Sequence, residues 1–474
     1  MKTYKMLING KLVGGTEAMP VINPATEDVI AHAPDCTRAE MDQAVAAARK
    51  AFPAWSATPI EKRKEIVAAI SKVIQDNAAE LVPLLTAEQG KPIKGAQEDV
   101  IGGAMWLMAG TQLEIPEHVI QDDDERYSFT RHVPLGVVAG IVPWNFPVLL
   151  AMFKIGPALV AGNTMVLKPS PTTPLTTLRI GELIADIVPA GVLNIISGSD
   201  RLGPWLTAHQ DVDKVSFTGS TATGKKVMEG AADGLKRLTL ELGGNDAAII
   251  LPDVDPKKTA EALFWAGFSN SGQICIATKR YYIHDSIYDK VRDEMAAIAA
   301  KIKVGDGSNP DTALGPIQNE KQYSRVKDII ENAKRSGLRF AYEGGIAQGP
   351  GFFIQPHIVD NPPDDAEIVQ AEQFGPIVPL MKYSDLDDAI SRANATNMGL
   401  GASVWSANTD AAMDVAERLE AGNVWINNFL HLHPLGAFAG AKQSGIGSEG
   451  GVEGALAYTQ TKTFHVLKQH PNAG

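Results

Sequence analysis

The chain of 474 residues contains only two cysteines, Cys36 and Cys275. Two widely separated cysteines cannot build the disulfide framework of a small secreted domain or a multi-cysteine zinc site. The first residues also lack the apolar run and the small-residue cleavage site of a secretory signal. We therefore expect a cytoplasmic protein whose thiols stay reduced.

Basic charge and long apolar runs are scarce as well. The 43 Lys and Arg residues are outnumbered by 55 Asp and Glu residues, which gives a formal net charge of −12. This balance disfavours nucleic acid and anionic membranes as main partners, because both require a basic face. The most apolar stretch, residues 133–167, is interrupted by four prolines and by Lys154, so it predicts buried strand, loop and helix rather than a membrane span. A small molecule is the expected partner.

The hydrophobic pattern predicts an α/β fold with two or three domains. Residues 5–30 indicate short strands, and helices follow the capping box Thr37-Arg-Ala-Glu40 and the helix starts near residues 60 and 78. Short apolar runs then alternate with helical segments, which is typical of a buried parallel sheet that binds ligands at the loops leaving its strands. These runs are residues 137–142, 164–167, 192–196 and 214–217.

The second half of the chain continues the α/β pattern. We expect strands at 247–251, 374–379, around 404 and at 424–426, and helices at 256–268, 287–302 and 320–337. The acidic run 121–125 indicates a solvated turn rather than a metal site. Residues 458–467 alternate like an edge strand, and we expect them to pair with residues 127–133 of another subunit.

Cys275 follows Ser271-Gly-Gln273, small and polar residues suited to a bend that leaves a thiol accessible. A thiolate is a strong nucleophile, and it needs a base and an oxyanion site. A lone cysteine is more often a small buried hydrophobe, and that interpretation applies to Cys36, which lies just before a predicted helix.

Three further motifs allow both a functional and a structural interpretation. The first motif is Gly219-Ser-Thr-Ala-Thr-Gly-Lys-Lys226, which follows a predicted strand and opens a predicted helix. Lys226 stands where an NTPase loop has Ser or Thr, so an NTPase is disfavoured. The motif is either a pyrophosphate-binding loop or a plain glycine-rich turn. Lys168 ends a buried strand and either binds ribose or phosphate or reaches solvent. Pro143-Trp-Asn-Phe-Pro147 is a stiff loop that presents Asn145 as an oxyanion donor or forms a rigid core turn.

Together the motifs resemble those of the aldehyde dehydrogenase superfamily over nearly the whole chain. Six of them occur in the family's order: Pro143-Trp-Asn-Phe-Pro147, Lys168-Pro-Ser170, Phe217-Thr-Gly-Ser220, Glu241-Leu-Gly-Gly244, Gly272-Gln-Ile-Cys275 and Glu372-Gln-Phe-Gly-Pro376. The resemblance implies a Rossmann-like NAD(P)-binding domain (residues 1–122 and 134–242), an α/β catalytic domain (243–440) and a small β bridging and oligomerisation segment (123–133 and 455–474). It also implies a homodimer or homotetramer.

The resemblance further implies a hydrolytic, non-CoA-acylating mechanism. Cys275 attacks the aldehyde, Asn145 holds the oxyanion, hydride leaves to the nicotinamide cofactor, and Glu241 activates the water that hydrolyses the thioester. Lys168 and Glu449 complete the catalytic set, Glu449 as a proton relay. The implied cofactor contacts are Pro143, Trp144, Lys168, Ser170, Pro171, Phe217, Gly219, Ser220, Gly243, Glu372 and Phe374.

Some positions depart from the family's motifs. Pro171 stands where many NAD-preferring relatives carry a Glu that binds the adenosine ribose, so we expect NAD and keep NADP as an alternative. The usual Gly-Arg-Glu reads Gly447-Ser-Glu449, and the usual Pro-Phe-Gly-Gly reads Ala437-Phe-Ala-Gly440.

The expected substrate pocket is mostly apolar and favours an aliphatic or aromatic aldehyde. Its two histidines are interpreted as loop surface or pocket lining, not as metal ligands. A non-redox cysteine acyl-transferase or esterase is the alternative function, and a non-catalytic descendant of the fold is a second one. The pocket comprises Phe146, Leu150, Phe153, Ile274, Ile276, Phe429, Leu430, His431, Leu432 and His433.

Overall fold

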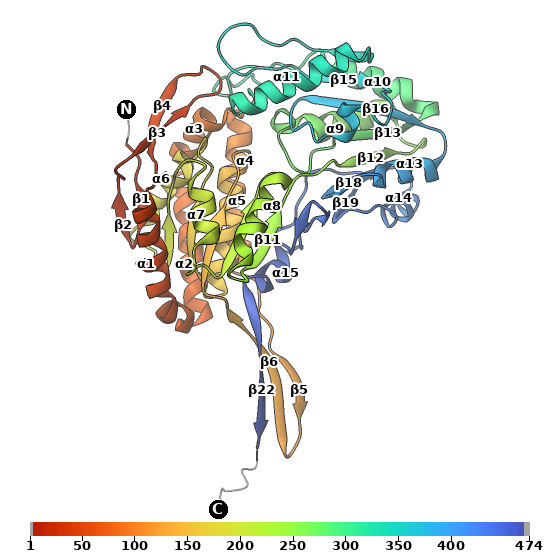
Figure 1. The fold of residues 1–474 in the computed structure, drawn as a ribbon. Helices are drawn as coiled ribbons and strands as arrows, with labels where there is room; N and C mark the ends of the chain where they lie inside the picture. Colours follow the sequence, from red (N-terminus) through yellow and green to blue (C-terminus); the bar gives the residue numbers. More distant parts are fainter. Residues whose placement is uncertain (1–2, 469–474) are drawn as a thin grey trace, which may run out of the picture.

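The computed structural model describes residues 3–468. It contains two large sheets, each covered by helices, and a long three-stranded arm that projects away from both (Figure 1). The fold is α/β with a Rossmann-like parallel sheet, as predicted. The predicted segments 1–122 and 455–474 extend at residues 1–2 and 469–474 beyond the described residues.

The first sheet has eight strands, and the five central ones, β9-β8-β7-β10-β11, are parallel. Four of these five match predicted apolar runs; β11, which ends at Glu241, was not predicted. Fully buried β7, β8 and β10 explain why their sequences are continuously apolar or small rather than alternating. In sheet order the strands are β2 (Lys11–Val13), β1 (Met6–Ile8), β9 (Leu193–Ile195), β8 (Thr164–Lys168), β7 (Val137–Ile141), β10 (Lys214–Thr218), β11 (Arg237–Glu241) and β21 (Gly445–Ile446).

The helices of this half begin largely where the sequence predicts. The capping box is confirmed: the Thr37 hydroxyl accepts a hydrogen bond from the Glu40 N–H, and the Glu40 carboxylate accepts one from the Thr37 N–H. The helices are α1 (Arg38–Ala57), α2 (Ile60–Asp76), α3 (Ala78–Gln89), α4 (Ile93–Gly110), α5 (Pro147–Val160), α6 (Leu175–Ile184), α7 (Leu202–Ala208) and α8 (Thr221–Ala232).

The second sheet has seven strands, all parallel except the β14–β15 pair. In order they are β14 (Phe340–Glu343), β15 (His357–Asp360), β16 (Ile377–Tyr383), β13 (Arg280–His284), β12 (Ala247–Ile250), β18 (Gly401–Trp405) and β19 (Asn423–Ile426). Its helices are α9 (Pro256–Phe268), η1 (Ser269–Gly272), α10 (Asp285–Ala299), α11 (Glu320–Arg335), α12 (Glu367–Gln370), α13 (Leu386–Asn394) and α14 (Thr409–Ala416). β16 begins later than predicted, because Phe374 adopts a left-handed φ of 51° that extended strands do not tolerate.

The arm is an antiparallel sheet of β5 (His118–Asp122), β6 (Arg126–Pro134) and β22 (Thr459–Leu467). β22 pairs with β6 of its own chain along its whole length, so the expected pairing with another subunit is wrong. Helix α15 (Gly451–Leu456) returns the chain to the base of β6, where Thr459 lies opposite Pro134. The remaining short strands form two pairs, β3 (Ala18–Ile22) with β4 (Val29–Pro34) and β17 (Met398–Gly399) with β20 (Ala441–Lys442).

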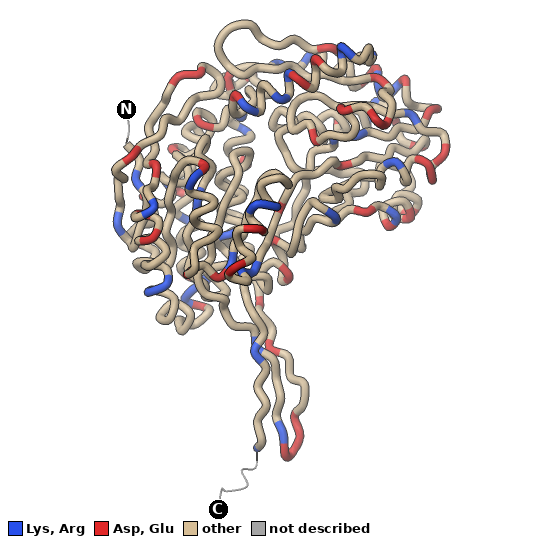
Figure 2. Tube along the Cα trace, in the orientation of Figure 1, with Lys and Arg blue, Asp and Glu red and all other residues tan. Residues whose placement is uncertain are grey.

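Charged residues of both signs are intermingled over the body (Figure 2). The predicted acidic turn is confirmed at the end of the β5–β6 hairpin, where the Asp123 carboxylate accepts hydrogen bonds from the N–H groups of Glu125 and Arg126. Of the helices within residues 3–468, none is long and apolar enough to cross a membrane.

Candidate active site

Four predicted site residues lie at one edge of the first sheet. Lys168 and Glu241 end β8 and β11, Asn145 follows β7, and Ser220 follows β10. The register places Lys168 opposite Ile141 and Glu241 opposite Thr218. Because parallel strands end on the same side of a sheet, these side chains converge there.

Asn145 is buried in the stiff loop between β7 and α5, whose first residue is Pro147. Its side-chain Nδ2 donates to the Gln273 carbonyl at 3.0 Å, two residues before Cys275. Its backbone carbonyl accepts a hydrogen bond from the Lys91 ammonium at 2.8 Å. Lys91 is itself held by a fully buried ion pair with Asp99 at 2.9 Å. The loop is thus fixed from both ends, and the second Nδ2 hydrogen stays free to donate.

The turn that carries Cys275 is built from left-handed residues: Asn270, Ser271 and Gly272 have φ values of 49°, 56° and 73°. A Cβ on Gly272 would lie 2.2 Å from the carbonyl oxygen of Gly375. Only glycine permits both this φ and this approach, which docks the turn against the loop before β16. Cys275 is half-buried there, whereas Cys36 is fully buried.

The environment of the Cys275 thiol disfavours its ionisation. Burial raises the pKa of this thiol to about 12, and the carboxylates Glu241, Asp246 and Glu372 act in the same direction. Lys279 is the charged group that opposes them. Its ammonium donates to the carbonyl of Cys275 at 2.6 Å.

Glu241 is 4% exposed, and neither of its carboxyl oxygens has a hydrogen-bond partner among the described residues. Burial raises the pKa of Glu241 well above its ordinary value; the charge of Glu449 adds to this shift and that of Lys154 opposes it. A carboxylate with a raised pKa is a stronger base near neutral pH, which suits general-base catalysis.

Glu449 forms a buried ion pair with Lys154 at 2.8 Å. The Ser216 hydroxyl donates to the same Glu449 oxygen at 2.9 Å, and it accepts a hydrogen bond from the Tyr458 hydroxyl at 3.1 Å. The segment after β21 is thereby fixed against the first sheet beside Glu241.

The dinucleotide-binding residues of the prediction form two groups. In the first, Lys168 is buried and, among the described residues, its ammonium donates to the Pro169 carbonyl alone, at 3.1 Å; burial lowers its pKa to about 8. Ser220 caps α8 by accepting a hydrogen bond from Thr223 N–H, while the Phe217 ring packs under Gly219. A lysine with further donors and a capped helix start at the same edge of the sheet fit a ribose and a phosphate. Ser170 and the half-buried Pro171 follow Lys168 directly.

The second group is formed by Gly243, Glu372, Trp144 and Phe374. The Glu372 carboxylate accepts a hydrogen bond from Gly244 N–H at 3.1 Å, and a Cβ on Gly243 would lie 2.3 Å from the same carboxylate. Trp144, which follows Pro143, and Phe374 meet edge to face with ring centroids 5.3 Å apart. The two loops therefore touch, although they are far apart in sequence.

Only part of the predicted pocket gathers around Cys275. One apolar cluster joins Cys275 to Phe146, Ile274, Ile276, Leu430 and Leu432. Other predicted pocket residues pack elsewhere. Phe429 packs against the core of the second sheet, and Leu150 packs against the core of the first. The Phe153 ring stacks on the Trp106 ring, with the ring centroids 3.7 Å apart. His431 and His433 are exposed.

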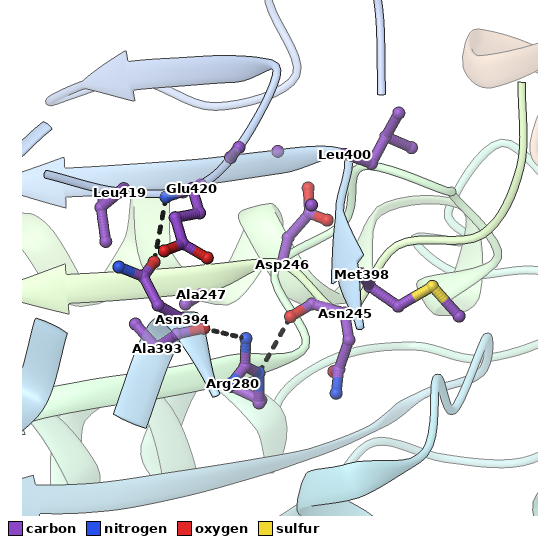
Figure 3. A pocket seen from close by; sticks show the side chains of 14 residues that line it. Asn245, Asp246, Ala247, Arg280, Ala393, Asn394, Met398, Leu400, Leu419 and Glu420 are labelled. Carbon is purple, nitrogen blue, oxygen red and sulfur yellow. Dashed lines mark hydrogen bonds between the residues drawn. The ribbon is translucent and has the colours of Figure 1, made fainter. Parts of the chain in front are cut away.

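Behind this cluster lies a small cavity of about 20 Å³. Figure 3 shows Asp246 and Leu400 at its wall, with Arg280 hydrogen-bonded to the carbonyls of Asn245 and Ala393. Leu400 also belongs to the Cys275 cluster. Burial raises the pKa of Asp246 to about 7.

The sequence interpretation missed the buried charges that support the site: Lys91, Asp99, Lys154, Asp246 and Lys279. Lys154 carried a signal, since a lysine inside an apolar helix needs a buried partner. Lys91 pairs with Asp99 eight residues further on, and Lys279 donates to carbonyls two to five residues before it, through turns that the hydrophobic pattern does not record.

Comparisons with known proteins agree with this geometry. Residues 13–464 match the model of the aldehyde dehydrogenase family. A protein named "Probable aldehyde dehydrogenase" from Pseudomonas sp. is 40% identical over 470 residues, which cover 98% of this chain and 95% of the relative. The solved structure of PnpE from Pseudomonas sp. WBC-3 superimposes with a TM-score of 0.95 at 36% identity and covers 100% of both chains.

The NAD⁺ complex of an aldehyde dehydrogenase from Bacillus cereus superimposes with a TM-score of 0.94 at 36% identity, covering 99% of this chain and 97% of that one. A nucleophile turn, a carboxamide loop and a buried carboxylate thus lie on a fold shared along almost the entire length. The chain belongs to the aldehyde dehydrogenase family, and it is an oxidoreductase that acts on aldehydes with a nicotinamide dinucleotide.

Proposed function

We propose that this protein oxidises an apolar aliphatic or aromatic aldehyde to the carboxylic acid through a thioester on Cys275. The observation that carries the proposal is the hydrogen bond from Asn145 to the Gln273 carbonyl, which ties the carboxamide loop to the nucleophile turn. Glu241 ends β11, two strands from β7 in the same sheet, and its carboxyl group has no hydrogen-bond partner among the described residues. We therefore assign the nucleophile to the Cys275 turn, the oxyanion donor to the loop after β7 and the base to the end of β11.

In the first step the Cys275 sulfur forms a bond to the aldehyde carbon, and the carbonyl electron pair moves to the oxygen. The free Asn145 N–H, with the Cys275 backbone N–H, donates to this oxyanion. The thiol proton must leave before attack, and we assign its acceptor to Glu241, whose carboxyl oxygens have no hydrogen-bond partner among the described residues and whose charge acts on the thiol.

Lys168, Ser220 and Glu372 would hold the dinucleotide, which when bound accepts the hydride from the aldehyde carbon. Loss of that hydride leaves an acyl group on Cys275. Once Glu241 has passed the thiol proton on toward Glu449, it takes a proton from a water molecule, whose oxygen attacks the acyl carbon while the carbon–sulfur bond breaks and its electron pair returns to the Cys275 sulfur. Glu449, which is held by Lys154 and whose charge acts on Glu241, is the second carboxylate of this proton path.

We infer the cofactor preference from the residue after Ser170 and the substrate preference from the residues around Cys275. Pro171 places no carboxylate after Ser170, so we propose NAD with NADP tolerated, since nothing at that position repels a 2′-phosphate. Cys275 is surrounded by Phe146, Ile276 and Leu432, which supports an apolar substrate tail.

The arm supports a homodimer or homotetramer. Apolar side chains on it are exposed, among them Val119, Ile120 and Leu467. Sedimentation of the purified protein tests this, and a monomer at micromolar concentration contradicts it.

The decisive experiment follows the absorbance of the reduced cofactor with a panel of aliphatic, aromatic and charged aldehydes and both cofactors. Cys275→Ala is expected to abolish turnover and to keep cofactor binding, whereas the buried Cys36→Ala control keeps activity. Thioester or ester hydrolysis without any cofactor reduction would instead indicate the non-redox acyl-transfer enzyme.

A second variant separates the two chemical steps. Glu241→Gln is expected to slow thioester hydrolysis more than hydride transfer, which appears as a burst of reduced cofactor followed by slow turnover. Slowing of both steps by the same factor contradicts the role of Glu241 as the hydrolytic base.

A further inference from the structure

Lys279 is a buried lysine that the mechanism above does not use. It is 2% exposed, and its three ammonium hydrogens are all directed to backbone carbonyls. The acceptors are the carbonyls of Ile274 at 2.8 Å, Cys275 at 2.6 Å and Ala277 at 2.9 Å. The side chain therefore closes the turn around the nucleophile.

A buried ammonium is a costly way to satisfy three carbonyls, because its charge must be removed from water. Among the described residues, none places a carboxylate within ion-pair distance of Lys279, in contrast to buried Lys91 and Lys154. The positive charge of Lys279 therefore has no ion-pair partner among these residues, and it lies against the backbone of Cys275.

Asp246 lies on the other side of the same turn. A Cβ on Gly244 would lie 2.4 Å from an Asp246 carboxyl oxygen and 2.7 Å from the Cys275 carbonyl oxygen. The Asp246 backbone carbonyl also accepts hydrogen bonds from the N–H groups of Lys279 and Arg280. The carboxyl group is buried and faces the cavity wall that Leu400 shares with the Cys275 cluster (Figure 3).

The other charged groups that act on the thiol are anionic. Glu241 approaches it from the end of β11, and Glu372 from the loop before β16. Among the described residues that act on the thiol, Lys279 is therefore the positive charge, and it is set against three carboxyl groups.

We propose that Lys279 is a positioning residue for the nucleophile: it fixes the Cys275 turn through three carbonyls and supplies the positive charge that favours the thiolate, while Asp246 partly offsets that charge. Removing the Lys279 charge should therefore lower the reactivity of the Cys275 thiol, and removing the Asp246 charge should raise it. This inference rests on the proposed role of Cys275, but its test requires no aldehyde.

The test measures the rate of Cys275 alkylation by iodoacetamide at about pH 8 in the full chain without cofactor, with peptide mass spectrometry to separate Cys275 from Cys36. Lys279→Met is expected to slow this alkylation about tenfold, because a pKa change of about one unit changes the thiolate fraction about tenfold. Asp246→Asn is expected to speed it about threefold, because Asp246 is ionised above a pH of about 7. Lys279→Arg keeps the charge and is expected to keep a rate near that of the wild type.

Arg280→Met is the matched control. Arg280 is also buried and also donates to three backbone carbonyls, those of Asn245, Arg392 and Ala393, but none of them belongs to the Cys275 turn. It is expected to lower thermal stability without changing the rate of Cys275 alkylation. If Lys279→Met does not fold, the faster alkylation of Asp246→Asn decides.

Equal changes of the alkylation rate in Lys279→Met and Arg280→Met, or an unchanged or slower alkylation in Asp246→Asn, overturn the proposal. Failure of the proposed function is distinguishable, because it appears as aldehyde oxidation that survives Cys275→Ala, whatever the alkylation profile shows.

Discussion

The two halves of the active site are positioned by different means. In the strand-end half, Asn145, Lys168 and Glu241 stand at or just beyond the ends of β7, β8 and β11, and sheet register sets their spacing. In the turn half, Cys275 is placed by left-handed residues and by the close approach of Gly272 to Gly375. The first half relies on hydrogen bonding repeated along the sheet, the second on individual contacts that single substitutions can destroy.

The largest expected loss of stability in the strand-end half comes from Lys154→Met. It leaves Glu449 buried without its ion-pair partner, which costs about 3–5 kcal/mol of unfolding free energy. Thermal unfolding measures the effect, with Lys62→Met as control, because Lys62 pairs with Glu65 on the surface and contributes about 0–1 kcal/mol. Adding Glu449→Gln to Lys154→Met should recover part of the loss; no recovery contradicts the ion-pair explanation.

Asn145→Ala breaks the link between the two halves. Loss of one oxyanion donor is expected to reduce kcat about 10²–10³-fold with little change in cofactor binding. Steady-state kinetics and dinucleotide titration measure the two quantities. A rise in KM with unchanged kcat would assign Asn145 to substrate binding instead.

Gly272→Ala tests the turn half alone. The substitution imposes a Cβ at positive φ and 2.2 Å from the Gly375 carbonyl, so we expect a loss of about 1–3 kcal/mol and reduced Cys275 alkylation. Gly337→Ala provides the comparison, since Gly337 also has a positive φ of 69° but no heavy atom within 4 Å of the added Cβ. Equal effects of both variants would mean that backbone strain, not the contact with Gly375, holds the turn.

Glu241→Gln gives the smallest and most specific effect, a change in the pH dependence of stability. The folded-state pKa of Glu241 is raised above its ordinary value of 4.5, so its contribution is fully present below about pH 4.5 and is lost as pH rises through the folded-state pKa. The variant should therefore gain stability relative to wild type with rising pH, by about 1 kcal/mol or more near pH 8. A constant difference from about pH 5 to about pH 9 contradicts the raised pKa.

The strand-end half could largely be predicted from the sequence. Val137-Val-Ala-Gly-Ile141 and Lys214-Val-Ser-Phe-Thr218 are too apolar or small for anything but buried strands, and the polar residues after them must then share an edge. β11, Arg237-Leu-Thr-Leu-Glu241, was not predicted. It lacks the continuous apolar run of the other buried strands, because polar and apolar residues alternate along it although its last three residues are buried.

The turn half and the arm could be predicted only in part. Residues 459–467 show the alternation of a strand, but the identity of its partner depends on where α15 returns the chain. Likewise Phe429 and Leu432 are neighbours in an apolar loop, yet they pack into different clusters, because the left-handed Leu430 between them turns the backbone.

The sequence by itself determined the α/β architecture, the strands that end at the site and the motifs that identify the family, because hydrophobic periodicity and glycine or proline placement act locally. Tertiary structure alone decided the ionisation of the site. Burial raises the pKa of Glu241 and Cys275, and the charges that modify these shifts, Lys279, Asp246, Glu372, Lys154 and Glu449, come from several separate segments. Desolvation and Coulomb interactions depend on distance in space, which no local pattern of residues records.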